Sequence, residues 1–425
     1  MSESGEREAS DRAVGGPLDG VTVVDLTSMV SGPLAAMILA DQGATVWKVE
    51  APGGDYSRDV ATRRGGFSAS FLNNNRNKKS VVLDLKQKAG REALLKLAAG
   101  ADVFLQNFRP GVAERLGLGE AAIRAAAPKV IYASIAGFGF DGPYAQKPVF
   151  DPLIQALSGL TTVQAGSDEA RPRLVRTILP DKLTGVQMAQ AICAALYHRE
   201  RSGCGQHIRL SMLDAVVAFL WHSDMGARTF IGDEPEREEA QSYIDLIYEV
   251  ADGYVSVAAM QDKHWEGLAR ATERLDLLRD PRFETPMGRE IHKEARLTLT
   301  QEALAPFRRD DILARLEAQD VPCAPVLTRA EMIAHPQIAA NDLLREAEHP
   351  AAGRLRQTRP APVFSAAPAE RLAPAPALGE HTREALAAAG YADEAIETLL
   401  ACGAAQAPLR GSARVDDAAD REDAG

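Results

Sequence analysis

Short apolar runs alternate with helical segments through the first third of the chain. The runs are rich in β-branched residues and lie at residues 21–26, 45–50, 80–85, 102–107 and 130–135. The helical segments between them lie at residues 34–42, 91–99 and 121–127. Strands that alternate with helices form crossover units, which place the strands side by side in a parallel sheet. Because the runs are continuously apolar, both faces of the sheet should be buried. The sequence therefore predicts an α/β fold with a doubly wound core.

The character of the chain changes after this region. A long helix is expected from about Lys182 to Arg201, because apolar residues recur there at helical spacing. Residues 242–326 open with short strands and become helical and highly charged, which indicates a smaller α+β domain. Residues 361–376 are rich in proline and alanine, so an extended segment is expected there. A last helical stretch covers residues 383–400.

These changes divide the chain into five expected parts. Residues 1–16 and 404–425 are polar or small and lack large apolar groups, so we expect disordered tails. Residues 17–225 are expected to form a large domain and residues 240–330 a small one. Residues 331–403 hold the extended segment and the last helical stretch.

Charge and composition exclude several classes of protein. The chain has 425 residues and a formal net charge of −11, which argues against a dedicated nucleic-acid binder because such proteins carry a basic surface. No stretch approaches the roughly 18 apolar residues of a membrane span, and the polar start lacks the apolar core of a signal peptide. The four cysteines show neither C-x-x-C nor metal-ligand spacing. Scattered thiols of this kind suit a reducing cytoplasm, and no metal site is predicted.

Three glycine-containing turns follow predicted strands, at the edge where parallel sheets bind ligands. Residues 28–33 open a helix whose free N–H groups could bind an anion, although a simple tight turn is slightly favoured. Residues 107–111 carry Arg109 and are followed by Arg115, and these arginines could hold phosphates, although a solvated turn is the commoner explanation. The third turn is residues 137–143. The turn after the first strand lacks the G-x-G-x-x-G pattern, so a dinucleotide site there is disfavoured.

Asp181 follows a proline at the start of the long predicted helix. An aspartate in this place is a good N-cap, and capping alone would explain it. An ionised carboxylate at a helix start can also act as a nucleophile. The ordinary pKa of aspartate, about 3.9, keeps it charged at pH 7 without a neighbouring base. Spacing alone favours the cap.

Taken together and in order, these segments resemble the class III CoA-transferase family, which includes formyl-CoA transferase, carnitine CoA-transferase and α-methylacyl-CoA racemase. The matching stretches are PLDGVTVVDLT, LADQGATVWKVEAPGGD, NRNKKSVVLDL, ADVFLQNFRPGVAERLGL, SGL, LPDKLTG, RERSGCGQHIRLSMLDA, VPCAPV and LGEHTREAL. They run from about Gly16 to Leu400, nearly the whole chain. Each stretch is weakly specific by itself, and their shared order carries the resemblance.

The resemblance implies a Rossmann-like large domain built from both ends of the chain and a small domain in the middle. It also implies a homodimer of two interlinked, ring-like subunits. Residues 331–403 would then be a linker and a C-terminal part that returns to the large domain. The implied substrates are an acyl-CoA and a carboxylic acid, and no tightly bound cofactor is expected.

Position by position, the resemblance places the catalytic aspartate of the transferases at Asp181. It implies CoA contacts from the turn after the first strand, the segment after the third strand, the N-F-x-P-G motif with a later arginine, and an aromatic residue near the thioester. These positions are Val30, Ser31, Leu83, Asp84, Leu85, Lys86, Asn107, Phe108, Arg109, Arg115 and Phe150. Asp181 is expected to form an anhydride with the acyl group and then a thioester with CoA, which is covalent catalysis.

Some positions depart from the family pattern. Formyl-CoA transferase has an arginine, a lysine and a glutamine where this chain has Ala51, Pro148 and Val30. Oxalate and formate are therefore disfavoured as substrates. The racemases use a histidine where Phe150 stands, and a phenylalanine cannot transfer a proton. Transferase chemistry is therefore favoured over racemase chemistry.

Alternatives remain open at this point. An acyl-CoA racemase or isomerase would use Asp181 as one base, and a non-catalytic relative would bind CoA without turnover. A nicotinamide dehydrogenase is disfavoured, because the turn after the first strand lacks the glycine pattern. The sequence does not identify the donor and acceptor acids of the transfer. Arg171, Arg173 and Arg176 precede Asp181 and could meet a dicarboxylate such as succinate, while a solvated charge cluster is the favoured explanation.

Overall fold

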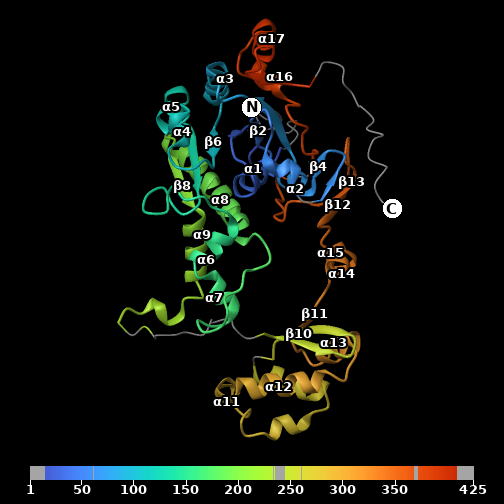
Figure 1. Cartoon of the computed structure of the whole chain (residues 1–425). Helices are drawn as coiled ribbons and strands as arrows, with labels where there is room; N and C mark the ends of the chain where they lie inside the picture. The colour runs from blue at the N-terminus through green and yellow to red at the C-terminus, as the bar shows by residue number, and fades with distance from the viewer. Residues whose placement is uncertain are drawn as a thin grey trace, which may run out of the picture. The chain divides into compact units, whose positions relative to one another are not determined.

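The computed structural model describes residues 15–60, 62–232, 234, 245–259, 261–367 and 372–408. The chain divides into two compact units, one made of residues up to 241 and from 343 onward, the other of residues 242–342. The first unit thus joins the early and late parts of the chain, coloured blue to green and red in Figure 1. Most of the tail expected over residues 1–16 lies outside the described residues.

A seven-stranded sheet with the order β14-β5-β2-β1-β6-β7-β8 forms the centre of the first unit. The strands are β1 (Thr22–Asp25), β2 (Thr45–Glu50), β5 (Lys78–Leu83), β6 (Val103–Gln106), β7 (Ile131–Ala136), β8 (His207–Ser211) and β14 (Ala405–Gln406). All neighbours pair parallel except β14 with β5. Without β14 this is the order of a doubly wound sheet, in which the direction of winding reverses between β1 and β6. The predicted α/β fold is confirmed.

Helices cover both faces of the sheet. On one face, α3 (Lys88–Ala99), α5 (Glu120–Ala126), α16 (Thr382–Ala388) and α17 (Asp393–Ala401) share an apolar cluster with Phe104 and Tyr132. On the other face, α1 (Ser31–Asp41), α6 (Asp151–Leu157), α8 (Leu179–Ser202) and α9 (Met212–Trp221) share a cluster with Val103 and Ile131. The apolar strands are therefore buried from both sides, as their composition predicts.

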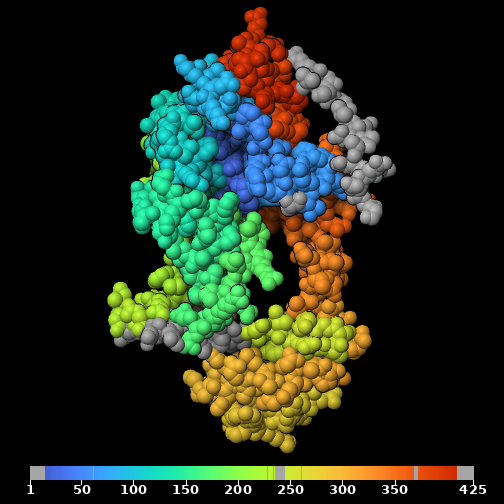
Figure 2. All heavy atoms as spheres, viewed as in Figure 1, coloured from blue at the N-terminus to red at the C-terminus, as the bar shows by residue number. Residues whose placement is uncertain are grey.

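The end of the chain packs on the first unit. Leu386 of α16 and Ile396 of α17 lie in the same apolar cluster as Leu94 of α3. Figure 2 shows these last helices, in red, beside the blue segment that includes α3. The single helical stretch predicted over residues 383–400 is two helices, because Gly390 adopts the left-handed conformation (φ +82°) that ends α16.

The prediction of an unstructured tail from residue 404 is wrong for its first residues. Ala404 is fully buried, and β14 pairs with Val82 and Leu83 at the outer edge of β5. An edge strand has free N–H and C=O groups that pair with any extended segment within reach. The pairing segment is too short and too poor in large apolar residues to show a strand pattern. Residues 409–425 lie outside the described part of the chain.

Small elements fill the connections of the first unit. They are η1 (Tyr56–Asp59), β3 (Arg63–Arg64), β4 (Phe67–Ser68), α2 (Ala69–Asn75), α4 (Val112–Arg115), α7 (Leu160–Ala165), η2 (Gly226–Thr229), β12 (Leu344–His349) and β13 (Gly353–Thr358). Strands β12 and β13 form a hairpin, and Phe67 and Phe71 pack against Ala352 in its turn. The Gln357 amide donates to the Leu72 carbonyl at 2.9 Å, which joins the hairpin to α2.

The second unit is a separate α+β body. Its antiparallel sheet has the order β11-β10-β9, from β9 (Ile247–Val250), β10 (Gly253–Val257) and β11 (Cys323–Pro325). Its helices are α10 (Asp262–Ala271), η3 (Leu275–Arg279), α11 (Pro286–Ile291), α12 (Lys293–Leu304), α13 (Arg309–Glu317), α14 (Arg329–Ala334) and α15 (Pro336–Ala340). Trp265 and Phe283 meet edge to face in its core, with ring centroids 5.3 Å apart. This unit therefore has an apolar core of its own.

Candidate active site

The two turns that follow β1 and β6 are joined at the point where the sheet reverses its winding. The Asn107 amide oxygen accepts from the Ser28 N–H at 3.0 Å, and the Asn107 amide nitrogen donates to the Ser28 carbonyl at 2.9 Å. Doubly wound sheets bind ligands in the crevice outside the carboxyl ends of these two strands. The two predicted CoA-binding turns therefore form one structure at the expected edge.

The turn after β1 holds an unusual backbone conformation. Met29 has φ +70°, in the left-handed region that non-glycine residues rarely adopt. Its N–H donates to Asp55 Oδ1 at 3.2 Å, and Asp55 Oδ2 accepts from Lys48 Nζ at 2.8 Å. Lys48 Nζ also donates to the Thr27 carbonyl at 3.1 Å. Burial works against the charge of Asp55, but the Lys48 ammonium holds the pKa of Asp55 below its ordinary value. The ion pair between Lys48 and Asp55 thus holds the backbone of the turn after β1 in place.

A second buried ion pair lies under the same turn. Lys78 Nζ and Asp25 Oδ2 are 3.0 Å apart, and both side chains are fully buried. Asp25 also accepts from the Thr27 N–H at 2.9 Å. Burial lowers the pKa of Lys78 to about 8. An unpaired charge in this interior would be costly, so the loss of any one of these two lysines and two aspartates would destabilise the arrangement.

Asp181 does not cap α8, because it is the third residue of that helix. Ile178 occupies the N-cap position without a side-chain bond, and Pro180 stands in the first turn, where proline is well tolerated. The helix therefore begins earlier than predicted, and the cap interpretation is wrong. Asp181 Oδ1 instead accepts from the N–H of Ser31, the first residue of α1, at 3.2 Å. A helix N-terminus carries free N–H groups and partial positive charge, which favour a carboxylate.

Close packing of α8 on α1 brings Asp181 to Ser31. A Cβ atom at Gly185 would lie 2.7 Å from the Ser31 carbonyl oxygen and 3.0 Å from Leu34 Cβ. Any side chain at residue 185 would therefore push the two helices apart. Gly185 lies four residues after Asp181, so both face α1 from the same side of α8.

A second carboxylate lies beside Asp181. Asp151, the first residue of α6, accepts from the Asp181 N–H through Oδ2 at 3.3 Å and from the Gln155 amide through Oδ1 at 2.6 Å. Burial and the nearby charge of Asp151 raise the pKa of Asp181 to about 6. Burial also raises the pKa of Asp151 above its ordinary value. Asp181 is therefore still mainly ionised at pH 7, and it is more basic than an ordinary aspartate.

Gln155 also ties the arginine-containing segment before α8 to this carboxylate. The buried Gln155 side chain accepts from the Val175 N–H at 2.9 Å and donates to the Thr177 carbonyl at 3.3 Å. Arg176, between these two anchored residues, is exposed, as are Arg171 and Arg173. The backbone of this segment is thus fixed next to Asp181, while its guanidinium groups face solvent.

The other predicted residues lie on the same edge of the sheet without contacting Asp181. Val30 and Leu83 have buried side chains, so any ligand contact from them would involve the backbone. Phe150 is 66% exposed and precedes Asp151. The segment after β5 is separated from β1 by β2, and it holds Asp84, Leu85 and Lys86. After β6 come Phe108, the exposed Arg109 and, at the end of α4, the exposed Arg115.

Comparison with known proteins gives the family. The model of CoA-transferase family III matches residues 18–382. This chain belongs to that family. A probable fatty acyl-CoA transferase of Mycobacterium tuberculosis is 34% identical over 391 residues, 87% of this chain and 98% of that protein. Human succinyl-CoA:glutarate CoA-transferase is 32% identical over 396 residues, 91% of this chain and 89% of that protein. The predicted class, an acyl-CoA:carboxylate CoA-transferase, is confirmed.

A solved structure of a similar protein has the same fold. A CAIB/BAIF family protein from Brucella suis is similar with a TM-score of 0.78 and 31% identity, over 88% of this chain and all of that one. Within the described residues of this family III protein, no helix is long and apolar enough to cross a membrane. Nor does that part of the chain gather three or more histidine, cysteine or acidic side chains in a group that could hold a metal.

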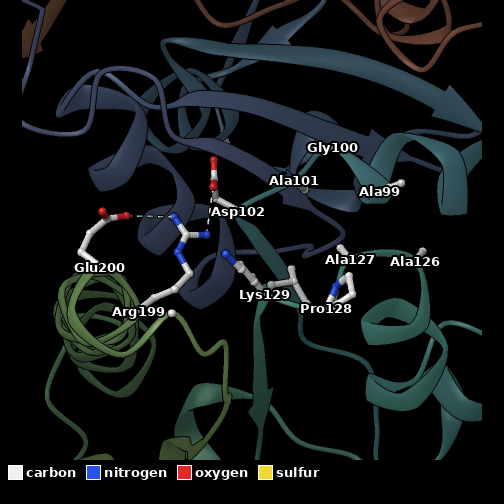
Figure 3. A pocket seen from close by; sticks show the side chains of 12 residues that line it. Ala99, Gly100, Ala101, Asp102, Ala126, Ala127, Pro128, Lys129, Arg199 and Glu200 are labelled. Carbon is white, nitrogen blue, oxygen red and sulfur yellow. Dashed lines mark ion pairs between the residues drawn. The ribbon is translucent and has the colours of Figure 1, made fainter.

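A cavity of about 660 Å³ lies at the opposite edge of the sheet (Figure 3). Its lining comes from the ends of α3, α5 and α8 and from the segments that lead into β6 and β7. Arg199 pairs there with Asp102 at 2.9 Å and with Glu200 at 3.8 Å. None of the predicted site residues lines this cavity, so it is separate from the surroundings of Asp181.

The sequence interpretation missed several residues that build the site. Asp151, Gln155 and Asp55 were not selected, because their role depends on tertiary contacts that spacing does not show. Some signals were nevertheless present. A charged Lys48 inside an otherwise apolar strand indicates a buried partner, and Gly185 one helical turn after Asp181 indicates a close helix contact.

Proposed function

We propose that this family III protein moves CoA from an acyl-CoA donor to an acceptor carboxylic acid through covalent intermediates on Asp181. The observation that carries the proposal is the position of the Asp181 carboxylate at the N-terminus of α1, 3.2 Å from the Ser31 N–H, beside the reversal point of the sheet. A half-buried carboxylate with a raised pKa is a stronger nucleophile than an ordinary aspartate and is still ionised at neutral pH.

The first half-reaction transfers CoA to the protein. An Asp181 oxygen attacks the thioester carbonyl, the carbon–sulfur bond breaks, and CoA leaves as the thiolate. A mixed anhydride joins Asp181 to the acyl group. The thiolate then attacks Asp181 Cγ, the anhydride carbon–oxygen bond breaks, and the donor acid leaves as its carboxylate. Asp181 is left as a thioester with CoA, and the step uses no water and no external proton.

The second half-reaction reverses this order with a new acid. The acceptor carboxylate attacks Asp181 Cγ, which expels the CoA thiolate and forms a second anhydride. The thiolate attacks the carbonyl that came from the acceptor, which releases the new acyl-CoA and the free Asp181 carboxylate. Because the first acid leaves before the second binds, the kinetics should be ping-pong.

The Ser31 N–H supports both half-reactions. Each attack at Asp181 Cγ puts negative charge on an Asp181 oxygen, and Oδ1 already faces this donor at 3.2 Å. Preorganised N–H groups aimed at a developing oxyanion are a major source of rate enhancement. The partial positive charge at the N-terminus of α1 adds to this effect. Gly185 sets the distance, because it allows α8 to lie against Ser31.

The CoA moiety is proposed to lie along the carboxyl edge of the sheet. Lys86, Arg109 and Arg115 are exposed there, and none of their side chains forms an ion pair within the described residues. Free cations of this kind suit the phosphates of CoA. The turn at Val30, the segment from Leu83 to Lys86, and Asn107 and Phe108 would contact the rest of CoA, and Phe150 the region of the thioester.

We also propose that the protein works as an interlinked homodimer. Large apolar side chains are exposed on two neighbouring helices, Val186 and Tyr197 on α8 and Phe219 and Trp221 on α9. Exposed apolar groups that gather in this way are typical of protein–protein interfaces. Light scattering coupled to gel filtration should give twice the mass of the chain, and a monomer at micromolar concentration would contradict the dimer.

The reaction is tested by mixing the protein with a panel of acyl-CoAs and free acids and following the acyl-CoAs by liquid chromatography. The panel should include dicarboxylic acids, because the human relative is named for succinyl-CoA and glutarate. A new acyl-CoA should form only when both partners are present, and Asp181→Ala should abolish it. Exchange of the Cα hydrogen for deuterium without any acceptor acid would point to the racemase alternative, and transfer by Asp181→Ala would contradict the proposal.

A further inference from the structure

A chain of side-chain hydrogen bonds crosses the sheet and ends at the turn after β6. The Phe108 N–H donates to Gln106 Oε1 at 2.8 Å, and Gln106 Nε2 donates to Ser134 Oγ at 2.9 Å. Gln106 is the last residue of β6, and Ser134 lies directly opposite it on β7. Both side chains are buried. The backbone of Phe108 is therefore connected to the interior of the neighbouring strand.

The hydrogen-bond chain continues to β8, the outer strand of the sheet, and from there to the surface. His207, the first residue of β8, has Nε2 at 2.9 Å from Ser134 Oγ and Nδ1 at 3.0 Å from Glu120 Oε2. Glu120 opens α5 and also pairs with Arg124 at 3.2 Å. All of these side chains lie on the sheet face that carries Tyr132, whose ring meets the His207 ring edge to face at 5.0 Å. The hydrogen-bond chain thus joins three strands and one helix.

The donor and acceptor groups of these side chains set the direction of each hydrogen bond in the hydrogen-bond chain. The Glu120 carboxylate only accepts, so His207 Nδ1 must carry a proton. With that proton on Nδ1, His207 Nε2 can accept from the Ser134 hydroxyl. The Ser134 oxygen accepts in turn from the Gln106 amide, whose oxygen accepts from the Phe108 N–H. Each donor meets one acceptor, so removal of Gln106, Ser134 or His207 leaves a buried polar group without this partner.

This arrangement contains a serine, a histidine and a carboxylate in hydrogen-bonding order, but it is not a hydrolytic site. Ser134 is 2% exposed and lies between two paired strands. Its hydroxyl already makes two hydrogen bonds, to Gln106 and His207. A catalytic serine must reach a substrate carbonyl and a nearby oxyanion site, which a saturated hydroxyl inside a sheet cannot do.

We propose that Gln106, Ser134, His207 and Glu120 are positioning residues for CoA binding. They fix the Phe108 N–H and so the turn that carries Asn107 and Arg109. The Asn107 side chain also bonds to both the N–H and the carbonyl of Ser28. The hydrogen-bond chain therefore also stabilises the turn after β1, which leads to Ser31 and its contact with Asp181. This inference rests on the proposed function, since it assumes that the turn after β6 contacts CoA.

The test compares variants by calorimetric binding of free CoA, by steady-state kinetics and by thermal unfolding. Ser134→Ala removes the hydroxyl, and Gln106→Met keeps the length of the side chain but removes both polar atoms. Because a buried partner is lost, each should raise the Kd of CoA and the KM of the acyl-CoA about five- to tenfold. The KM of the acceptor acid should stay within about twofold, because that acid enters after CoA is already attached. Ser134→Thr retains the hydroxyl and should restore CoA binding.

Two further variants separate positioning from general stability. Gln357→Met is matched to Gln106→Met, because it removes a buried amide that donates to the Leu72 carbonyl and takes no part in the hydrogen-bond chain. It should lower the unfolding temperature without changing the Kd of CoA. Glu120→Ala removes the partly exposed end of the hydrogen-bond chain with little change in packing. It therefore gives a folded variant if Ser134→Ala does not fold, and it should raise the Kd of CoA.

The outcomes distinguish the two proposals. Selective loss of CoA affinity in the variants of the hydrogen-bond chain, with the affinity of Gln357→Met unchanged, supports the positioning role. Unchanged CoA affinity, or equal rises in the KM of both substrates, overturns that role while the transferase proposal stands. Wild-type protein that binds no CoA overturns the proposed function and the positioning role together.

Discussion

Asp181 is held in surroundings that oppose its charge. Burial and the Asp151 carboxylate raise the pKa of Asp181 to about 6. A raised acid pKa means that the folded protein favours the protonated form. The ionised form that the proposed chemistry needs therefore costs stability, and this cost develops as the pH rises from about 4, the ordinary value of the pKa, to about 6. Such a trade between stability and activity is common in active sites.

Asp181→Asn should therefore stabilise the protein while it removes activity. Asparagine can still accept from the Ser31 N–H but carries no charge beside Asp151. At pH 7 the free energy of unfolding should rise by about 1–3 kcal/mol, since one pKa unit corresponds to about 1.4 kcal/mol. The gain should disappear near pH 4. Denaturant unfolding at both pH values measures it, and a variant less stable than wild type at pH 7 would contradict the pKa shift.

The pH dependence of kcat/KM should reflect the same group. Activity should fall as the pH drops through about 6, because Asp181 becomes protonated. Asp151→Asn removes a neighbouring charge but keeps an acceptor for the Asp181 N–H, so the acid limb should move to lower pH. Asp214→Asn, at an exposed position on α9, is the matched control and should leave the limb in place. If the acid limb of Asp151→Asn does not move, or moves to higher pH, the Asp151 carboxylate does not raise the pKa of Asp181.

Among the helices, the contact between α8 and α1 brings Asp181 to Ser31 and so creates the proposed site. The long helix after Asp181 was predicted from its periodicity, and its contact partner was not, because a helix pattern shows which face is buried but not against what. The apolar strands were likewise predicted from a local sequence pattern. The short strands β3, β4 and β14 escaped detection, since two residues cannot show an alternating pattern.

Gly185→Ala tests this helix contact. Alanine has a higher helix propensity by about 1 kcal/mol, so an exposed site would gain stability. Here the added Cβ meets the Ser31 carbonyl at 2.7 Å, and we expect a net loss of about 1–3 kcal/mol. The kcat should fall as well, because Asp181 moves away from the Ser31 N–H. Gln190→Ala, at an exposed position of the same helix, should change neither quantity. A stabilised and fully active Gly185→Ala protein would show that the contact is not needed.

At the scale of the whole molecule, the end of the chain completes the sheet beside the proposed CoA segment. The Asp84 N–H donates to the Ala404 carbonyl at 2.9 Å, and β14 pairs with β5. A protein ending at Gly403 should lose about 1–3 kcal/mol of stability, because buried edge bonds are lost, and should bind CoA more weakly. A protein ending at Pro408 keeps these contacts and should match the full chain in both measurements. Equal behaviour of the two shortened proteins would contradict this role.

The family and the fold were thus accessible from the sequence, and only part of the site was. Alternation of strands and helices gives a parallel sheet, and the edge of such a sheet that binds ligands follows from its topology. Asp181 was distinguished from an ordinary helix cap only by the resemblance to CoA-transferases. Its partners Asp151 and Ser31 lie 30 and 150 residues away along the chain, and hydrogen bonds over such separations leave no local pattern.

The most direct test is the covalent intermediate. The protein is incubated with an acyl-CoA that it turns over, without acceptor acid, and its intact mass is measured before and after treatment with hydroxylamine. We expect an added mass of CoA less water, located on the peptide that contains Asp181, removed by hydroxylamine and absent from Asp181→Ala. An active protein that stays unmodified with every donor, or an adduct that persists in Asp181→Ala, would contradict an aspartyl mechanism.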